Sequence, residues 1–353
     1  MTTARQEIAP EGVEGIYHCI SRCVRRAFLC GEDPYTGRSF EHRKQWVQDR
    51  LKQFAEAFAI DIFAFAVMSN HLHVVLRTRP DLVESWGDEE IAWRWLLVYP
   101  KKNRGGRSES PTEAEIAALA GDKRRVELLR GRLCSLGWFM RRLNETIARS
   151  ANKEDGCKGR FWEGRFKCQV LLDETAVLTC MAYVDLNPIR SGLAVSPETS
   201  LHTSAQVRIT ARQARLRLDM ASAGAVAGRK PFPSQLVELE EEKAKSDWWL
   251  FPLSHESPGA DNGSLEFSLD EYLSLVDWTG RQMKRDLPGK IPEDLKPILA
   301  RLKFENENWI GAVRTYGRMF FRAAGRVESL RRAASSAGRC WYQGVGRGRL
   351  LFS

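Results

Sequence analysis

The sequence predicts an α+β fold, because its first 190 residues contain both strand-like apolar runs and helices with an apolar face. Of its 353 residues, 43% are hydrophobic and 28% are charged, which is typical of a folded, soluble chain and excludes a largely disordered one. The best apolar run, Ile62 to Met68, falls far short of the ~18 residues that a membrane span needs. The chain exceeds one typical domain, so we expect a main globular unit with additional segments.

The N-terminal elements are predicted in the order strand, helix, hairpin. Residues 16–22 (IYHCISR) suit a strand. Residues 41–59 repeat apolar side chains at three- and four-residue spacing, which predicts an amphipathic helix. Two further apolar stretches, 61–67 and 71–77, are separated by a short polar break, so they predict a hairpin.

Helices are predicted for most of the following segment. Residues 80–155 are rich in helix formers and are interpreted as an insertion, whose best helix spans 136–149. A loop then leads into a strand near Phe166. Asp173 can cap the next helix, which should end near Asn187 because a proline follows and disfavours helical geometry in the residue before it.

Weaker signals divide the remainder of the chain. Residues 220–234 and 252–264 look like linkers, and the last helical pattern covers about 293–335. We therefore expect three regions: a main domain over 1–200, a linker and helical extension over 201–264, and a basic helical module over 265–353.

The charge distribution favours a polyanionic partner. The formal net charge is +9 and the sequence pI is near 9.2. Residues 301–353 hold eleven basic and three acidic side chains, a net of +8, and residues 101–150 have a net of +6, whereas residues 251–300 have a net of −4. Concentrated positive charge suits phosphate contacts and therefore nucleic acid. Arginine-rich helices that are simply solvated would give the same composition.

A pair of histidines opens the second strand of the predicted hairpin, as His71-Leu72-His73. Alternate residues of a strand point to the same side, so both imidazoles face one way and Leu72 faces the other. Neutral imidazole nitrogens bind metal ions, and two of them leave room for an oxygen ligand and a substrate phosphate. Two histidines that make ordinary hydrogen bonds would give the same pattern.

Tyr183 and Asn187 are four residues apart on the helix predicted after Asp173. At this spacing their side chains are neighbours on one face. A tyrosine hydroxyl can act as a nucleophile when its target is polarised, and an amide oxygen can bind a hard divalent cation. A packed tyrosine and an asparagine at a helix end are the structural alternatives.

Together, these motifs resemble the REP-associated tyrosine transposases, a branch of the HUH single-tyrosine transposases. The strings that carry the resemblance are YHCISR, FAVMSNHLHVVLR, GRFWEGRFKCQVLLDE and MAYVDLNPIRSGL. It covers residues 15–195, interrupted by the segment 80–155, and EYLSLVDWTGR at 271–281 is similar to a string of longer members.

The resemblance implies a ferredoxin-like antiparallel sheet with helices on one face, the HUH fold. It assigns the nucleophile to Tyr183 and the metal ligands to His71, His73 and Asn187, with Mg²⁺ or Mn²⁺ as the cofactor. The implied reaction cleaves and rejoins single-stranded or hairpin DNA through a 5′-phosphotyrosine link, with REP-like palindromes as targets. The extra segments favour a monomer, with a dimer as the alternative.

Basic side chains lie near these motifs, and in the segment 159–172 they are interleaved with aromatic ones. Such a mixture suits backbone contacts and base stacking, which is worth ~1–3 kcal/mol per base. Burial in the core is the alternative for the aromatic members. The predicted DNA-binding residues are Arg22, Arg25, Arg26, Arg160, Trp162, Arg165 and Lys167.

Cysteine usage and the remaining histidines complete the sequence-based expectations. Eight cysteines are too sparse for a disulfide scaffold and suit reduced thiols in a cytosol. The expected location is the cytoplasm, in association with the nucleoid. Cys19, Cys23 and Cys30 cluster without a Cys-x-x-Cys pair, which disfavours a structural zinc site. His18 is interpreted as structural or DNA-facing. Three other functions stay open: a hairpin-binding regulator that does not cut, a relaxase-like nickase, and a protein that acts on RNA.

Overall fold

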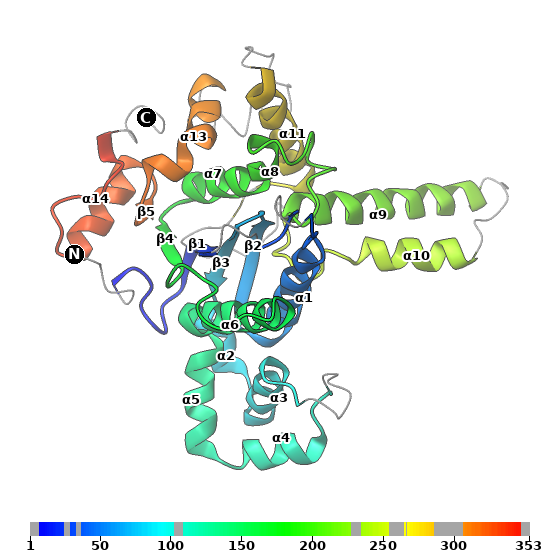
Figure 1. The fold of residues 1–353 in the computed structure, drawn as a ribbon, viewed down its shortest axis with the longest axis vertical. Coiled ribbons are helices and arrows are strands. Elements are labelled where there is room, and N and C mark those ends of the chain that lie inside the picture. The colour runs from blue at the N-terminus through cyan, green and yellow to red at the C-terminus, as the bar shows by residue number, and fades with distance from the viewer. Residues whose placement is uncertain are drawn as a thin grey trace.

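A central sheet organises the chain, for which a computed structural model describes residues 7–24, 29–32, 37–101, 109–226, 234–253, 265, 267–285 and 306–346. The sheet has five strands in the order β2-β3-β1-β4-β5 (Figure 1). The strands are β1 (Gly15–Arg22), β2 (Ile60–Val67), β3 (His71–Thr78), β4 (Lys167–Leu171) and β5 (Ala323–Ala324).

The strand pairing confirms the predicted hairpin. β2 and β3 pair antiparallel across the short break at residues 68–70, and β1 lies antiparallel between β3 and β4. The implied all-antiparallel sheet is wrong for β5, which pairs parallel with β4. β5 is reached only after the chain has passed through the C-terminal helices, and such a long connection allows a strand to return in the same direction.

Helices form most of the remaining structure. They are α1 (His42–Ala57), α2 (Pro80–Ser85), α3 (Asp88–Val98), α4 (Glu113–Ala120), α5 (Lys123–Leu133), α6 (Leu136–Glu154), α7 (Glu174–Asp185), α8 (Asn187–Arg190), α9 (Ser204–Val226), α10 (Ser234–Ala244), α11 (Leu269–Arg285), α13 (Asn306–Met319) and α14 (Val327–Ser336). No helix in the described part of the chain is long and apolar enough to cross a membrane.

Helices cover both faces of the sheet, so the expectation of helices on one face is wrong (Figure 1). On one face, Leu72 and its period-two neighbours pack with α1 and α6 in one apolar cluster. On the other face, Val75 packs with α7, α11 and α13 in a second cluster. The sequences of β2 and β3 are almost continuously apolar, so both strands place apolar side chains on both faces of the sheet. Helices on each face bury these side chains.

The described residues of the segment 80–155, which leave out 102–108, are mostly helical, as predicted. α3, α4 and α5 pack on one another and extend away from the sheet, whereas α6 lies along it (Figure 1). The side chain of Thr112 accepts the backbone N–H of Glu115 and forms a capping box that begins α4.

Two expectations for the later segments need correction. The predicted linker at 220–234 is helical in α9 up to Val226, and residues 227–233 lie outside the described part. Of the linker predicted at 252–264, only residues 252–253 are described. The single helical pattern at 293–335 contains two helices, α13 and α14, separated by β5, and residues 293–305 also lie outside the described part.

The helix predicted to end near Asn187 ends earlier. Asp173 caps α7 as expected, by accepting the backbone N–H of Ala176 at 2.9 Å. α7 ends at Asp185, and α8 then begins at Asn187. Proline is tolerated in the first turn of a helix because the N–H groups there have no helical partner, so Pro188 starts a new helix instead of ending an old one.

A buried carboxylate ties α7 to the helices that follow it. The Asp185 side chain accepts hydrogen bonds from the Ser204 hydroxyl at 2.5 Å, the Ala205 backbone N–H at 2.9 Å and the Tyr272 hydroxyl at 2.6 Å. These donors belong to α9 and α11. The end of α7 is therefore held in place by three polar contacts inside the core.

Candidate active site

A pocket of about 220 Å³ lies where β1, β3 and α7 meet the loop before β4. It contains three of the four residues predicted for chemistry, and the fourth, Asn187, contacts His73 directly. The lining residues are Ile20, Arg22, His71, His73, Glu163, Gly164, Arg165, Lys167 and Tyr183.

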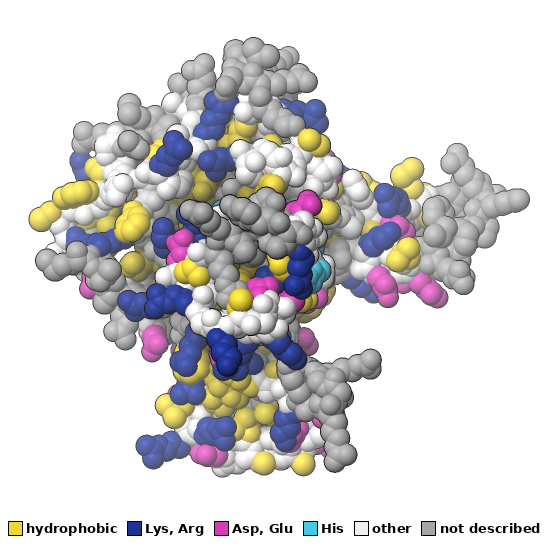
Figure 2. All heavy atoms as spheres, in the orientation of Figure 1, with side chains coloured by type: hydrophobic (Ala, Val, Ile, Leu, Met, Phe, Trp, Pro, Cys, Tyr) yellow, Lys and Arg dark blue, Asp and Glu magenta, His cyan; other side chains and the backbone are white. Residues whose placement is uncertain are grey.

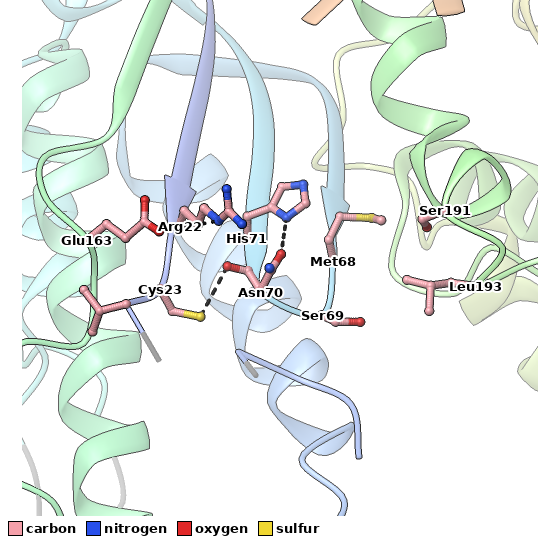
Figure 3. A pocket seen from close by; sticks show the side chains of 10 residues that line it. Arg22, Cys23, Met68, Ser69, Asn70, His71, Glu163, Ser191 and Leu193 are labelled. Atoms are coloured by element: carbon pink, nitrogen blue, oxygen red, sulfur yellow. Dashed lines mark hydrogen bonds and ion pairs between the residues drawn. The ribbon is translucent and has the colours of Figure 1, made fainter. Parts of the chain in front are cut away.

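His71 and His73 face the same side of β3, with ring centroids 4.7 Å apart, as the strand periodicity predicts. His71 Nδ1 lies 2.6 Å from Asn70 Oδ1 (Figure 3). The amide oxygen can only accept, so Nδ1 carries the proton and Nε2 is the unprotonated nitrogen of His71.

His73 lies in a chain of three side chains. The Asn187 amide Nδ2 is 3.1 Å from His73 Nε2, and His73 Nδ1 is 2.9 Å from His18 Nε2. The amide N–H donates to Nε2, so the proton of neutral His73 is on Nδ1 and is donated to His18. The hydrogen bonds thus set one tautomer for both predicted ligands, with Nε2 unprotonated and Nδ1 held by a neighbour.

Burial keeps these imidazoles neutral. Desolvation, together with the smaller effect of the positive charge of Arg22, lowers the pKa of His71 to about 4. Burial likewise lowers the pKa of His18 to about 4, and it holds the pKa of His73 well below its usual value. Neutral imidazole is the form that binds metal ions.

Tyr183 lies beside this pair on α7. Its ring centroid is 5.7 Å from that of His73, and the Arg190 guanidinium lies 4.7 Å from the Tyr183 ring centroid. The hydroxyl rests against the backbone of α13, because a Cβ built on Gly317 would lie 2.6 Å from Tyr183 Oη. The tyrosine is therefore held between the sheet and a C-terminal helix.

A second tyrosine, Tyr316, lies close enough to compete for the same role. Its ring centroid is 5.3 Å from that of Tyr183. Tyr316 is completely buried, however, and burial raises its pKa well above the usual value. Tyr183 is only partly buried and lines the pocket, so it is the better placed nucleophile of the two.

The predicted DNA-binding residues are placed differently from one another. Arg22, Arg165 and Lys167 are exposed and line the pocket, and Arg22 forms a 3.5 Å ion pair with Glu163. Arg160 is exposed. Arg25 and Arg26 lie outside the described residues.

Trp162 was predicted to bind DNA by stacking on a base, and this prediction is wrong. It is buried in the cluster beneath the sheet and donates its indole N–H to the Asn144 carbonyl at 2.8 Å. Phe161 and Phe166 are buried in the same cluster. These aromatic side chains are core residues because burying their large apolar surface stabilises the fold more than exposing it in a loop.

Basic side chains do not gather in one patch on the face seen in Figure 2. Lys and Arg are spread across the whole of that face, with acidic side chains between them. On this face the basic side chains do not mark out a binding surface, and the basic residues that line the pocket are the more specific evidence.

The sequence did not indicate that His18 and Arg190 lie beside the candidate catalytic residues. His18 is on β1 and reaches His73 only because β1 pairs with β3 in a register that places Ile20 opposite His73. The residue pattern of one strand does not predict its register with a distant strand. The sequence therefore predicted only that His18 and Ile20 lie on the same face of β1, and not that His18 contacts His73.

A second pocket, of about 540 Å³, adjoins the first at the β2–β3 turn (Figure 3). The two share Arg22, His71 and Glu163. Figure 3 shows Ser191 and Leu193 across this opening from the turn. The imidazole of His71 therefore lines both pockets.

The donor atoms suit a divalent cation that prefers nitrogen and oxygen ligands. Nε2 of both histidines is unprotonated, but His73 Nε2 accepts the Asn187 N–H in this structure. A cation would replace this hydrogen bond, and the Asn187 amide would turn to present its oxygen. Within the described ranges no group of three or more His, Cys, Asp or Glu side chains could hold a metal. The fit depends on the amide as the third ligand.

Comparison with known proteins gives little beyond this geometry. No family model and no curated protein matches the chain. Among the solved structures, a REP-associated tyrosine transposase bound to a REP hairpin is similar at 11% identity, over 58% of this chain and 82% of that chain, with a TM-score of 0.29. A score this low does not establish a common fold.

Proposed function

We propose that this chain is a metal-dependent, single-strand DNA endonuclease and strand transferase of the REP-associated tyrosine transposase type. One observation supports this most strongly: His71, His73 and Tyr183 line one pocket, and Asn187, from a third element, contacts His73 directly. A purely structural role would not require two histidines to line the same pocket as a tyrosine and exposed basic side chains.

In the proposed site, His71 and His73 would hold Mg²⁺ or Mn²⁺ through Nε2, and Asn187 would hold it through its amide oxygen. The bound ion would draw charge from a non-bridging oxygen of the scissile phosphate. Asn70 and His18 orient the two imidazoles by accepting their Nδ1 protons. Arg165 and Lys167, exposed at the pocket wall, attract the phosphates on either side.

Tyr183 then attacks phosphorus through Oη. A bond forms between Oη and phosphorus as the bond from phosphorus to the 3′ oxygen breaks, and the proton lost by the phenol is balanced by the one gained by the departing 3′-hydroxyl. The 5′-phosphotyrosine link conserves the phosphodiester, so attack by another 3′-hydroxyl reverses the step and joins strands. Arg190, beside the ring, favours the negative charge that develops on the phenol oxygen.

A covalent-adduct assay tests the proposal. The purified chain is mixed with Mn²⁺ and labelled single-stranded hairpins from the flanks of its own gene, and the products are separated on a denaturing gel. We expect a shifted band that EDTA removes and that Tyr183→Phe abolishes. Tyr316→Phe is the matched control, because it removes the neighbouring hydroxyl, which is buried against the Cys180 thiol and does not line the pocket of Tyr183, and it should leave the band.

The outcomes separate the alternatives. A band that survives Tyr183→Phe but not Tyr316→Phe would reassign the nucleophile. Cleavage that persists in EDTA, or in the double variant His71→Ala, His73→Ala, would reject the metal role. Tight hairpin binding without a band on any flanking hairpin would favour a regulator that binds and does not cut.

A further inference from the structure

A third cavity, of about 650 Å³, lies on the other side of the candidate active site, between β1, β4 and α13. It shares Ile20, Arg165 and Lys167 with the pocket that contains Tyr183. The three cavities are therefore consecutive: the opening at the β2–β3 turn, the pocket of the histidines and Tyr183, and this cavity against α13. A polymer strand whose phosphate lay at Tyr183 would extend into it.

The walls of this cavity are aromatic and basic. Phe320 is buried on one side, and Phe321 is 60% exposed at the rim. Arg165 and Lys167 are exposed where the cavity meets the active-site pocket. An exposed aromatic ring beside cations suits the planar, uncharged base of a nucleotide whose phosphate lies among the cations.

The buried polar groups of this cavity wall are hydrogen-bonded within the protein. Gln169, whose side chain is 6% exposed, is hydrogen-bonded to the ring of His18. The completely buried hydroxyl of Tyr316 is hydrogen-bonded to the Cys180 thiol. Because these groups already have partners, the exposed ring of Phe321 and the two cations are the groups left to contact a ligand.

We propose that this cavity binds a nucleobase of single-stranded DNA next to the scissile phosphate, with Phe321 stacked on the base and with Arg165 and Lys167 beside its phosphate. The inference rests on the proposed function, because it takes the position of the strand from the phosphate at Tyr183. Every nucleobase has a flat face, so stacking on Phe321 holds a base in the strand without requiring one identity.

Binding without cleavage tests this directly. Fluorescence anisotropy in EDTA compares two short labelled single strands of equal length, one with mixed bases and one in which every nucleotide is an abasic tetrahydrofuran. Both carry the same phosphates, so the ratio of their affinities measures base contacts alone. We expect Phe321→Ala to weaken binding of the base-bearing strand by roughly 5- to 100-fold and to leave the abasic strand within about two-fold.

A matched control variant separates the effect of Phe321 from the loss of any exposed aromatic side chain. Trp248→Ala removes another exposed aromatic side chain, 59% exposed and outside the cavity, and should leave both affinities unchanged.

The proposal is overturned if Phe321→Ala weakens both strands equally, or if Trp248→Ala has the same effect as Phe321→Ala. Tighter binding of an RNA strand of the same sequence would overturn the choice of DNA.

The covalent-adduct assay distinguishes failure of the base-binding cavity from failure of the proposed cleavage reaction. An adduct without any base preference rejects this cavity alone, whereas a base preference that depends on Phe321 without an adduct rejects the cleavage reaction and keeps the binding site.

Discussion

Replacing Gly317 with alanine should slow cleavage and leave the fold intact, because the added methyl group would collide with the candidate nucleophile. A Cβ at this position would lie 2.6 Å from Tyr183 Oη and 3.2 Å from Tyr183 Cζ. Non-bonded heavy atoms are in optimal contact at roughly 3.5–4.0 Å. The Tyr183 hydroxyl would therefore have to retreat by about 1 Å from its place against α13.

The size of the effect follows from that displacement. A misplacement of about 1 Å in a reacting group can lower a rate by on the order of 100-fold, so we expect cleavage to fall by roughly 10- to 100-fold. Stability should change little. Alanine in place of glycine within a helix is worth about 1 kcal/mol, and tilting the tyrosine away from its rotamer costs about 0.5–1.5 kcal/mol. The two effects nearly cancel.

Single-turnover formation of the Tyr183 adduct, followed on a denaturing gel, measures the rate, and thermal denaturation measures the stability. Gly131→Ala is the matched control, because Gly131 is also inside a helix, α5, and a Cβ there would meet nothing within 4 Å. It should stabilise the chain slightly and leave the rate unchanged. An unchanged rate in Gly317→Ala would show that the position of the hydroxyl against α13 does not matter for cleavage.

Two further predictions concern stability. Tyr272→Phe should lower the free energy of unfolding by about 1.5–3 kcal/mol in chemical denaturation, because it removes the hydrogen bond to buried Asp185. Tyr316→Phe, equally buried but bonded to the Cys180 thiol, should lower it by only about 0.5–1.5 kcal/mol. The free energy of unfolding should also fall as the pH is lowered from about 6.5 to about 4: His18 and His71 have pKa values of about 4 in the folded chain, so over this range the unfolded chain binds more protons. His18→Gln, which keeps an acceptor for His73 and does not titrate, should reduce that slope by up to about 1.4 kcal/mol per pH unit, and an equal slope in both proteins would contradict the assignment.

Local patterns in the sequence predicted the elements that carry the candidate site. The hairpin and the common direction of His71 and His73 followed from period-two alternation, and Asp173 marked the start of α7. Each of these features depends on residues within a few positions of one another, where backbone geometry alone decides the result.

Features that depend on distant segments could not be predicted in this way. Pro188 was expected to end a helix and starts one, since the same residue suits the first turn of the next helix. Trp162 was expected to stack on DNA, although its indole N–H has a partner in Asn144 of α6. In both cases a local rule allowed two outcomes, and packing against another segment selected one of them.

The C-terminal residues illustrate why the site is more than its four motif residues. Arg190, which lies over the Tyr183 ring, donates to the Arg314 carbonyl at 2.9 Å, and Gly317 supplies the surface on which the Tyr183 hydroxyl rests. Both contacts belong to α13, and β5, the next strand, completes the sheet beside β4. A tyrosine on a helix can occupy several rotamers, but a nucleophile must be held in one position. In this chain, residues of α13 that are more than 120 positions away hold Tyr183 in place. α13 is therefore as much a part of the candidate site as β3, the strand that carries the histidines.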